Sequence, residues 1–319
     1  MGSMAAATTG LAAIALPRTG FIGLGAMGEP MAGHLADRGL LAVVGNRTLA
    51  KAQAFVAARR AAAAGPQAVA TATATASGAS LRAASAFADY AGCDVLVLCV
   101  SADADVLENV DGLASVLTPG AIVIDHSTVA VETAREAASR LAARGIGFLD
   151  APVSGGVEGA KNSRLSVMVG GEEATLERVR PVLVAYAARI ALMGPTGAGQ
   201  ATKAVNQILV AGINEAVCEG LAFAEKLGLA PERLLPTLMA GAAANWFLDK
   251  RGATMLRSEF QPGFKCAHMA KDLRIVQAMA ERAGIRHPVI DRALADYSEL
   301  EARGDGELDT SALIALKRG

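Results

Sequence analysis

One long apolar stretch divides this sequence into two patterns. It opens with Gly197-Ala-Gly-Gln-Ala-Thr-Lys-Ala-Val-Asn-Gln207 and runs on to Lys226 without a break. Before it, short apolar segments alternate with segments of helical spacing, whereas the pattern after it indicates about five helices and no strand. An unbroken helix over residues 198–226 would be about 43 Å long at 1.5 Å per residue. We therefore expect a single helix that joins two domains, with Lys203 near its start.

The first pattern predicts a parallel sheet with helices on both faces. Segments such as residues 95–100 are apolar throughout, which is typical of strands buried on both sides. The expected strands are 18–22, 40–44, 94–100, 121–124, 147–153, 165–169 and 190–193. The expected helices are 29–38, 49–60, 104–117, 131–144 and 172–187, with Thr48 as the N-cap of the second. Residues 61–86, rich in Ala, Thr, Ser and Gly, are expected to form a surface loop with a weak strand and helix.

Composition excludes several kinds of partner. The 319 residues are enough for two domains, and the net charge of −1 gives no positive surface for nucleic acid. No apolar run is expected to span a membrane. The four cysteines have no metal-ligand spacing, so we expect no metal site and buried free thiols in a reducing compartment. A cytoplasmic location follows, or an organelle matrix if residues 4–16 are the remnant of a leader.

A glycine loop lies between the first expected strand and the first expected helix. In Gly23-x-Gly25-x-x-Gly28 the glycines let the backbone turn tightly and approach a pyrophosphate, whose charge the helix N-terminus favours. The alternative is a turn that needs glycine for steric reasons only. Because the loop opens a series of strands and helices, we favour a dinucleotide site. Its expected residues are Gly23, Leu24, Gly25, Ala26, Met27 and Gly28.

The end of the second expected strand bears on the choice of cofactor. An NAD site places a carboxylate there for the ribose 2′-hydroxyl, but this chain has Asn46-Arg47-Thr48. A guanidinium suits a 2′-phosphate, because its planar fork donates charge-assisted hydrogen bonds to phosphate oxygens. We therefore expect Asn46, Arg47 and Thr48 to bind NADP. The alternative is NAD, with Arg47 solvated beside the site.

Two further strand ends supply polar groups at the same edge of the sheet. Ligands of open parallel sheets bind at the carboxyl ends of strands. We expect Val100, Ser101, Ser127 and Thr128 to contact the cofactor, with Ser127 or Thr128 at the nicotinamide ribose or amide. His126 is expected to be structural rather than a base, because no carboxylate lies at an obvious spacing.

The segment Asp150-Ala-Pro-Val-Ser-Gly-Gly156 is a candidate anion site. Its glycines expose consecutive backbone N–H groups, and Ser154 adds a hydroxyl. Such a cluster can hold a carboxylate without a formal positive charge. The alternative is an ordinary turn after a strand.

Lys203, Asn206 and Gln207 share one face of the long helix because they are three and four residues apart. Lys203 is either a solvated helix residue or the proton donor of an interdomain site. Burial beside a carboxylate-binding loop would tune its pKa and let it protonate a carbonyl oxygen during hydride transfer.

A later helix carries His268-Met-Ala-Lys271-Asp272. Lys271 is expected to reach the cofactor or the substrate carboxylate, the alternative being a surface pair with Asp272. Trp246 and Phe247 are expected to belong to a core rather than to line a pocket.

Together these motifs resemble the β-hydroxyacid dehydrogenase family, which includes 3-hydroxyisobutyrate dehydrogenase, tartronate semialdehyde reductase and the glyoxylate/succinic semialdehyde reductases. The residues that carry the resemblance are Gly20–Met31, Asp150–Gly156, Gly197–Gln207 and Lys271–Leu273. The family fold implies an N-terminal Rossmann domain with a doubly wound, mainly parallel sheet, a long linking helix and an all-helical C-terminal domain. The implied organisation is an N-terminal extension over 1–17, an NADP-binding domain over 18–195 and a substrate and dimerisation domain over 196–319, in a homodimer or homotetramer.

The resemblance also implies residue roles. Lys203 is similar to the family's catalytic lysine, and Asn206 to its polar helper. Ser154, Gly155 and Gly156 resemble the substrate-carboxylate loop, with Ser154 at the reacting centre, and Lys271 and Gln207 are implied substrate contacts. We therefore expect an NADP-preferring oxidoreductase that interconverts a small hydroxy acid and its semialdehyde or keto acid. The alternatives are a non-catalytic NADP-binding scaffold or sensor, and an imine reductase of the same superfamily, against which the presence of Lys203 counts.

Overall fold

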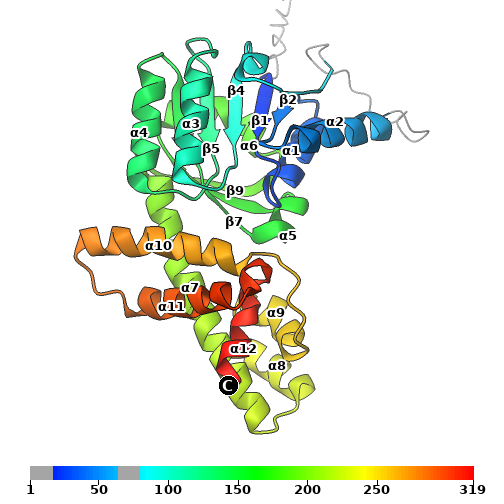
Figure 1. The fold of residues 1–319 in the computed structure, drawn as a ribbon, viewed down its shortest axis with the longest axis vertical. Coiled ribbons are helices and arrows are strands. Elements are labelled where there is room, and N and C mark those ends of the chain that lie inside the picture. Colours follow the sequence, from blue (N-terminus) through cyan, green and yellow to red (C-terminus); the bar gives the residue numbers. More distant parts are fainter. Residues whose placement is uncertain (1–16, 64–79) are drawn as a thin grey trace, which may run out of the picture.

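The computed structural model describes residues 17–63 and 80–319. The extension expected before residue 17, and residues 64–79 of the Ala/Thr-rich segment, lie outside the described residues. Figure 1 shows a sheet with its helices in the upper part and a helical part below, joined by helix α7 (Ala198–Lys226). This helix has the bounds that the apolar run predicted.

The upper part is built on a mainly parallel sheet in the described residues. Its strand order is β3-β2-β1-β4-β5-β6-β8-β7, and β9 pairs with β8. All the pairs from β3 to β6 are parallel, whereas β8 runs antiparallel to β6 and β7. The strands are β1 Thr19–Ile22, β2 Leu41–Gly45, β3 Arg82–Ala83, β4 Val95–Leu98, β5 Ile122–Asp125, β6 Gly147–Asp150, β7 Val153–Ser154, β8 Leu165–Gly170 and β9 Ala187–Gly194.

Two expected strands were wrong in extent. The last one spans Ala187–Gly194 rather than 190–193 and begins where the expected helix 172–187 was to end, since α6 stops at Leu183. The run 147–153 forms two strands, because the chain leaves the parallel ladder at Ala151-Pro152. Pro152 has no N–H for a ladder hydrogen bond, and its carbonyl instead accepts from Met168 N of β8 at 3.0 Å. The chain therefore turns from β5 towards β8, and Ser154 reaches the edge of the sheet near the helical part.

Helices cover both faces of the sheet because its strands alternate their side chains between two cores. Val95 and Val97 of β4 join one core with α1 and α2, whereas Leu96 and Leu98 join the other with α3 and α4. The helices of this part are α1 Gly28–Asp37, α2 Leu49–Ala63, η2 Phe87–Tyr90, α3 Asp103–Ala114, α4 Val131–Ala142, α5 Gly156–Lys161 and α6 Glu173–Leu183.

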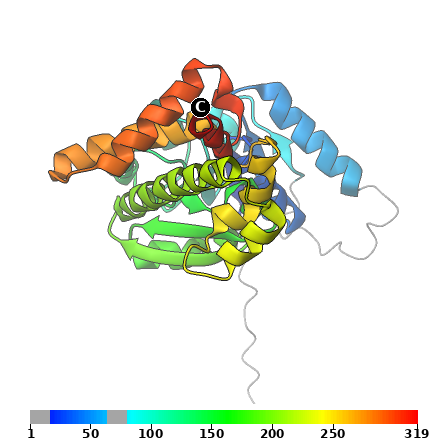
Figure 2. The ribbon, with the colours of Figure 1, turned by 90° about the horizontal axis from the view of Figure 1, so that it is seen from below.

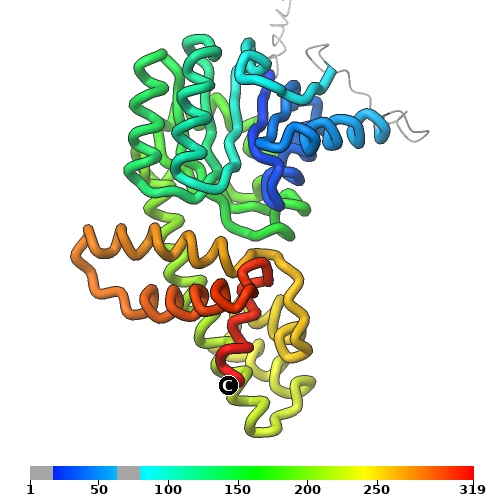
Figure 3. The backbone as a smooth tube through the Cα atoms, in the orientation of Figure 1, coloured from blue at the N-terminus to red at the C-terminus, as the bar shows by residue number. Residues whose placement is uncertain are grey.

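Residues 197–319 form helices and short 3₁₀ turns around a third core. Five helices have nine residues or more, as the sequence pattern indicated. The elements after α7 are α8 Pro231–Met239, α9 Trp246–Leu256, α10 Cys266–Ala283, α11 Pro288–Ala302, η3 Asp305–Glu307, η4 Thr310–Leu313 and α12 Ile314–Lys317. Figure 3 shows that the chain passes between the two parts through α7, and Figure 2 that α10 and α11 lie together on one side of that helix. In Figure 1, α10 is the helix beside the lower edge of the sheet part.

The four cysteines are free, as expected. Of the two adjacent aromatic residues, Phe247 is buried in the helical core, whereas Trp246 is exposed under the guanidinium of Arg251. The expectation for Trp246 was therefore wrong, because its position on α9 faces solvent.

Candidate active site

The glycine loop has the shape of a phosphate cradle. Gly23 has a φ of 103°, and a Cβ there would lie 2.1 Å from the carbonyl oxygen of Cys99. A Cβ on Gly28 would lie 1.9 Å from the carbonyl oxygen of Gly23. At Gly25, by contrast, a Cβ would meet nothing within 4 Å. The two outer glycines thus close the turn, and the middle one leaves its backbone open to a diphosphate at the start of α1.

Asn46 holds this loop from the end of β2. Its Oδ1 accepts a hydrogen bond from Leu24 N at 3.0 Å, and its Nδ2 donates to the carbonyl oxygen of Thr48 at 3.3 Å. The side chains of Arg47 and Thr48 are exposed beside it. Asn46 therefore shapes the loop, and Arg47 is the group at this strand end that is free to extend towards a phosphate.

The other strand ends meet a lysine from the helical part. The Nζ of Lys271 on α10 donates to the carbonyl oxygens of Thr128 at 2.7 Å and Ser101 at 3.3 Å. The hydroxyl of Ser127 accepts from Val100 N at 2.9 Å, which ties the ends of β4 and β5 together. All four residues expected here thus lie at one edge of the sheet, with Lys271 above them.

The residues at the end of β5 have structural partners. His126 is buried, with Nδ1 2.5 Å from the carbonyl oxygen of Ala151 and Nε2 2.8 Å from the hydroxyl of Tyr186. Burial lowers the pKa of His126 to about 4. Asp125 accepts from Ser127 N at 2.9 Å through Oδ1, whereas its buried Oδ2 has no hydrogen-bond partner in the described residues. Burial raises the pKa of Asp125 to about 7.

The start of α7 is fixed against the sheet by Asp150. Its two carboxylate oxygens accept from Gly197 N at 2.7 Å and Gln200 N at 2.9 Å, so they take two of the donors that a helix N-terminus leaves unpaired. Gly199 permits the approach, because a Cβ there would lie 2.4 Å from the carbonyl oxygen of Met168. Gln200 then donates to the carbonyl oxygen of Ser127 at 2.7 Å. Lys203, one turn further on, is therefore rigidly placed.

Lys203 is buried, with 8% of its surface exposed. Burial lowers its pKa, while the nearby carboxylate of Asp272 raises it and the charge of Lys271 lowers it. No hydrogen bond or ion pair of its Nζ is found within the described part of the chain. The ammonium is thus a donor that has little water around it, near the carboxyl edge of the sheet.

A chain of polar side chains runs beside Lys203 from the sheet to α10. Ser154 Oγ donates to Asn206 Oδ1 at 3.3 Å, and Asn206 Nδ2 donates to Gln207 Oε1 at 2.8 Å. Gln207 Nε2 then donates to Asp272 Oδ2 at 2.8 Å, and Asp272 Oδ1 lies 3.0 Å from the Nζ of Lys271. Both amides take part: Asn206 faces Ser154, and Gln207 faces Asp272.

The loop after Ser154 exposes backbone donors. Gly155 and Gly156 have φ values of 130° and 61°, which glycine adopts at no steric cost. A Cβ on Gly156 would meet only the carbonyl oxygen of Gly263, at 3.8 Å. The loop therefore lies beside Gly263 of the helical part, with room around its backbone.

Sequence reasoning assigned no role to Asp150, Gln200 or Asp272. One signal for Asp272 was present, because it shares the face of α10 with the buried Met269, Leu273 and Val276. A carboxylate on an apolar helix face needs a partner inside the protein. The pair of Lys271 and Asp272 that was expected as the alternative is present, but Asp272 is 3% exposed, so the expectation that the pair lies at the surface is wrong.

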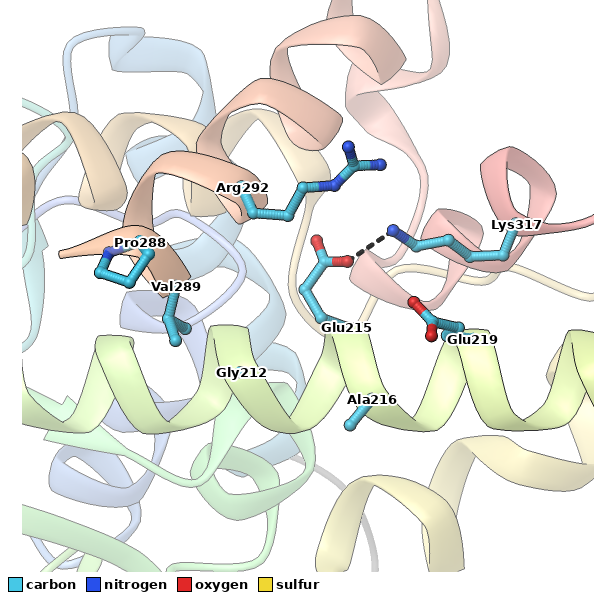
Figure 4. Close-up of a pocket in the computed structure, with 8 residues that line it drawn as sticks. All are labelled: Gly212, Glu215, Ala216, Glu219, Pro288, Val289, Arg292 and Lys317. Atoms are coloured by element: carbon cyan, nitrogen blue, oxygen red, sulfur yellow. Dashed lines mark ion pairs between the residues drawn. The ribbon is translucent and has the colours of Figure 1, made fainter.

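A separate pocket of about 520 Å³ lies further along α7. It is lined by Glu215 and Glu219 of α7, Pro288, Val289 and Arg292 of α11, and Lys317 of α12, with Gly212 and Ala216. Figure 4 shows Lys317 directed at Glu215, whose Oε2 lies 2.6 Å from its Nζ. None of the expected site residues lines this pocket. Among the described residues, no group of three metal-ligating side chains is found either.

Two family models together cover the described fold. Residues 18–194 match the NAD binding domain of 6-phosphogluconate dehydrogenase. Residues 197–317 match the NAD-binding domain of NADP-dependent 3-hydroxyisobutyrate dehydrogenase.

Three relatives match over almost the whole chain. A probable 3-hydroxyisobutyrate dehydrogenase-like mitochondrial protein of Arabidopsis thaliana is 35% identical, over 94% of this chain and 85% of that protein. The 2-hydroxy-3-oxopropionate reductase of Escherichia coli is 34% identical, over 93% of this chain and 96% of the relative. The solved 3-hydroxyisobutyrate dehydrogenase of Mycobacterium tuberculosis with L-serine is 30% identical, with a TM-score of 0.80 over 95% of this chain and 100% of that one.

Proposed function

The chain belongs to the β-hydroxyacid dehydrogenase family, and we propose that it is an NADP-preferring enzyme that interconverts a small hydroxy acid and its semialdehyde or keto acid. Membership makes it an NAD(P)-dependent oxidoreductase of hydroxy acids. Substrates of the 3-hydroxyisobutyrate, tartronate semialdehyde, glyoxylate or succinic semialdehyde type are the proposed range. Residues 18–195 are the proposed cofactor domain, and 196–319 the proposed substrate and dimerisation domain.

The proposed cofactor site is the edge formed by the glycine loop and the ends of β2, β4 and β5. Residues 23–28 would hold the diphosphate, and Arg47 with Thr48 the 2′-phosphate. The exposed guanidinium and the absence of a carboxylate from residues 46–48 support the preference for NADP. Val100, Ser101, Ser127, Thr128 and Lys271 would face the nicotinamide end. When bound, the nicotinamide supplies or accepts the hydride.

The substrate carboxylate is proposed to bind at Ser154, Gly155 and Gly156. Two consecutive glycines with positive φ can present adjacent backbone N–H groups to one anion, which supports anion binding without a cation in contact. Gln207 and Lys271 lie towards the other end of the series of hydrogen-bonded side chains that begins at Ser154. They would contact the rest of the substrate.

Buried Lys203 is the observation that carries the proposal. In the direction of reduction it would donate a proton to the carbonyl oxygen, and in oxidation its neutral form would accept the proton of the hydroxyl. A pKa lowered by burial favours both exchanges near neutral pH. Asn206, which is hydrogen-bonded to Ser154, would hold the substrate oxygen in line with the lysine.

The two alternatives are less well supported. A scaffold or sensor without turnover has no need for a buried lysine at the carboxyl edge of the sheet. Structures of imine reductases share the fold at about one-fifth identity, for example 19% with a TM-score of 0.59 for the enzyme of Pseudomonas, which shows the fold alone.

A substrate panel tests the proposal. Oxidation of NADPH and NADH is followed with glyoxylate, succinic semialdehyde and tartronate semialdehyde, and the reverse reaction with 3-hydroxyisobutyrate. Turnover of one of these with NADPH is expected, at least tenfold more efficient than with NADH. Tight cofactor binding without turnover across the panel would favour the scaffold, and an NADH preference of tenfold would reject the NADP assignment.

Lys203→Ala tests the proton donor. It is expected to lose about 10²–10⁴-fold in kcat, the usual contribution of general acid–base catalysis, while still binding cofactor. Lys226→Ala, which removes an exposed lysine at the other end of the same helix, is the matched control and should keep full activity. Near-full turnover of Lys203→Ala would refute the assignment.

A small substrate and a second copy of this chain are the proposed partners, in a homodimer or homotetramer, and the proposed location is cytoplasmic. Among the described helices, α7 alone is long and apolar enough to pass a length-and-composition test for a membrane span, and 39% of that window is buried inside the protein.

A further inference from the structure

The short helix α5 is held at its carboxyl end by a histidine from another element. A helix leaves its last four carbonyl groups without partners inside the helix. Here the Nε2 of His34 lies 3.0 Å from the carbonyl oxygen of Ala160, which also accepts from Ser163 N at 3.4 Å, and 3.1 Å from the carbonyl oxygen of Lys161. Carbonyl oxygens only accept hydrogen bonds, so Nε2 must carry a hydrogen, which the two oxygens share.

This contact joins the two proposed halves of the active site. His34 belongs to α1, whose N-terminus opens at the glycine loop, and it lies six residues, or about 9 Å, beyond Gly28. Helix α5 begins directly after Ser154 and Gly155. In Figure 1, α5 lies at the lower edge of the sheet part, beside the helical part. His34 thus connects the helix under the proposed diphosphate site to the loop proposed for the substrate carboxylate.

Besides the packing of Ala160 in the core, α5 has a further side-chain contact with the helical part, and it is weaker. Glu158 lies 3.3 Å from the Nη1 of Arg251 on α9, but its side chain is largely exposed, and such ion pairs contribute little to stability. The loop itself has two consecutive glycines with positive φ, which have wide conformational freedom. The direction of its backbone N–H groups therefore depends strongly on how α5 is anchored.

We propose that His34 is a positioning residue that couples cofactor binding at α1 to the order of the Ser154–Gly156 loop. Cofactor bound at the glycine loop restricts the motion of α1. The hydrogen bonds of His34 then restrict the motion of α5 and of the Ser154–Gly156 loop. By linkage, substrate in the loop strengthens cofactor binding by the same factor. This inference rests on the proposed function, because it needs a dinucleotide at the glycine loop.

Amide hydrogen exchange tests the coupling without any turnover. NADP⁺ is added to the full chain, and exchange is followed in peptides that cover residues 23–28 and 153–164. In the unsubstituted protein NADP⁺ is expected to slow exchange in both. In His34→Ala and His34→Phe, the second of which keeps the ring volume, slowing is expected to persist at 23–28 but to fall at least threefold at 153–164. His34→Gln should restore the slowing of exchange at 153–164, because the Nε2 of glutamine can donate in place of the histidine Nε2.

Steady-state kinetics give a second readout. His34→Ala is expected to raise KM for the aldehyde acid about threefold to tenfold, with kcat within twofold and with the cofactor affinity measured without substrate also within twofold. Glu158→Gln, which removes the exposed ion pair on the same helix, is the control and should change neither parameter by more than twofold.

The outcomes separate the two proposals. Equal slowing at 153–164 in His34→Phe and in the unsubstituted protein would overturn the coupling and leave the proposed function intact. No response at 23–28 of the unsubstituted protein to either NADP⁺ or NAD⁺ would overturn the proposed cofactor site, and the coupling with it.

Discussion

At the scale of single residues, the surroundings of Lys203 shift its pKa in opposite directions. Burial and the charge of Lys271 lower the pKa, whereas the carboxylate of Asp272 raises it. Asp272 is itself held by Gln207 and Lys271, so its charge is fixed in place. The lysine thus combines a dry environment with one charged partner that limits the fall of its pKa.

Asp272→Asn should therefore lower the pKa of Lys203 further, because it removes the group that raises it. In the direction of reduction the lysine must be protonated, so the alkaline limb of the kcat/KM profile should move to lower pH. The profile is measured with NADPH and the best aldehyde acid of the panel. Asp249→Asn, an exposed change on α9, is the control. An alkaline limb at the same pH in both variants would contradict the role of Asp272.

Asp125 predicts a different pH effect, on stability. Its pKa in the folded protein is about 7 and its ordinary value 3.8, because burial disfavours the charged form. The folded state therefore binds the proton more tightly than the unfolded state, and this carboxyl makes the fold less stable as pH rises from about 4 to about 7.

Asp125→Asn removes this loss of stability at higher pH, and its amide oxygen can still accept a hydrogen bond from Ser127 N. The Tm of the variant minus that of the unsubstituted protein should be larger at pH 7.5 than at pH 5, as measured by thermal unfolding. Buried His126, whose pKa is lowered, is present in both proteins and cancels in the difference. A difference that does not change with pH would contradict this account.

At the scale of elements, the joining helix is the part on which the site depends. The apolar run predicted its bounds, but its attachment to the sheet rests on Asp150, 47 residues away from Gly197 in the chain. Two buried backbone donors, Gly197 N and Gln200 N, have their partners in this one carboxylate.

Asp150→Ala should lower the free energy of unfolding by about 2–6 kcal/mol, because it leaves two buried donors without a partner and each costs about 1–3 kcal/mol. Asp150→Asn keeps one acceptor oxygen, so its loss should be intermediate. Urea unfolding followed by circular dichroism measures both. A loss below about 0.5 kcal/mol for the alanine variant would show that the capping contacts do not stabilise the joining helix.

At the scale of the whole molecule, α7 is not fully covered by the rest of the chain. Val205, Leu209 and Phe223 are more than half exposed along it, and Val289 at the start of α11 is 44% exposed. Large exposed apolar side chains that recur along one helix in this way are typical of an interface between protein chains. It supports the proposed homo-oligomer, with a second copy of this chain packed against α7.

Leu209→Glu is expected to convert the oligomer to a monomer at micromolar concentration, because an unpaired charge would be buried in the interface. Light scattering after size-exclusion chromatography measures the mass. Val184→Glu changes a residue of similar exposure, 49%, beside α6, and should keep the oligomer. An unchanged mass for Leu209→Glu would exclude this face of α7.

The sequence alone determined the local features of this protein. The unbroken apolar run of β4, the glycine loop and the continuous helix from Ala198 to Lys226 all follow from the apolar pattern and from the backbone freedom of glycine, which act over a few residues. Motifs far apart in the chain could be expected at one edge of the sheet, because the carboxyl ends of parallel strands meet there. The bend at Pro152 and the antiparallel direction of β8 could not be predicted from the sequence, since they depend on which strands pair.

Only the tertiary structure decided the partners of the charged and polar groups. Asp150 meets the start of α7, Asp272 meets Gln207, and His34 meets the end of α5, at separations of 47, 65 and 126 residues. Such contacts depend on the packing of whole elements, and no local spacing encodes them. For the same reason the sequence left undecided whether Lys203 is solvated or buried. Its burial and its lowered pKa result from the packing of α10 and the edge of the sheet around the first turns of α7.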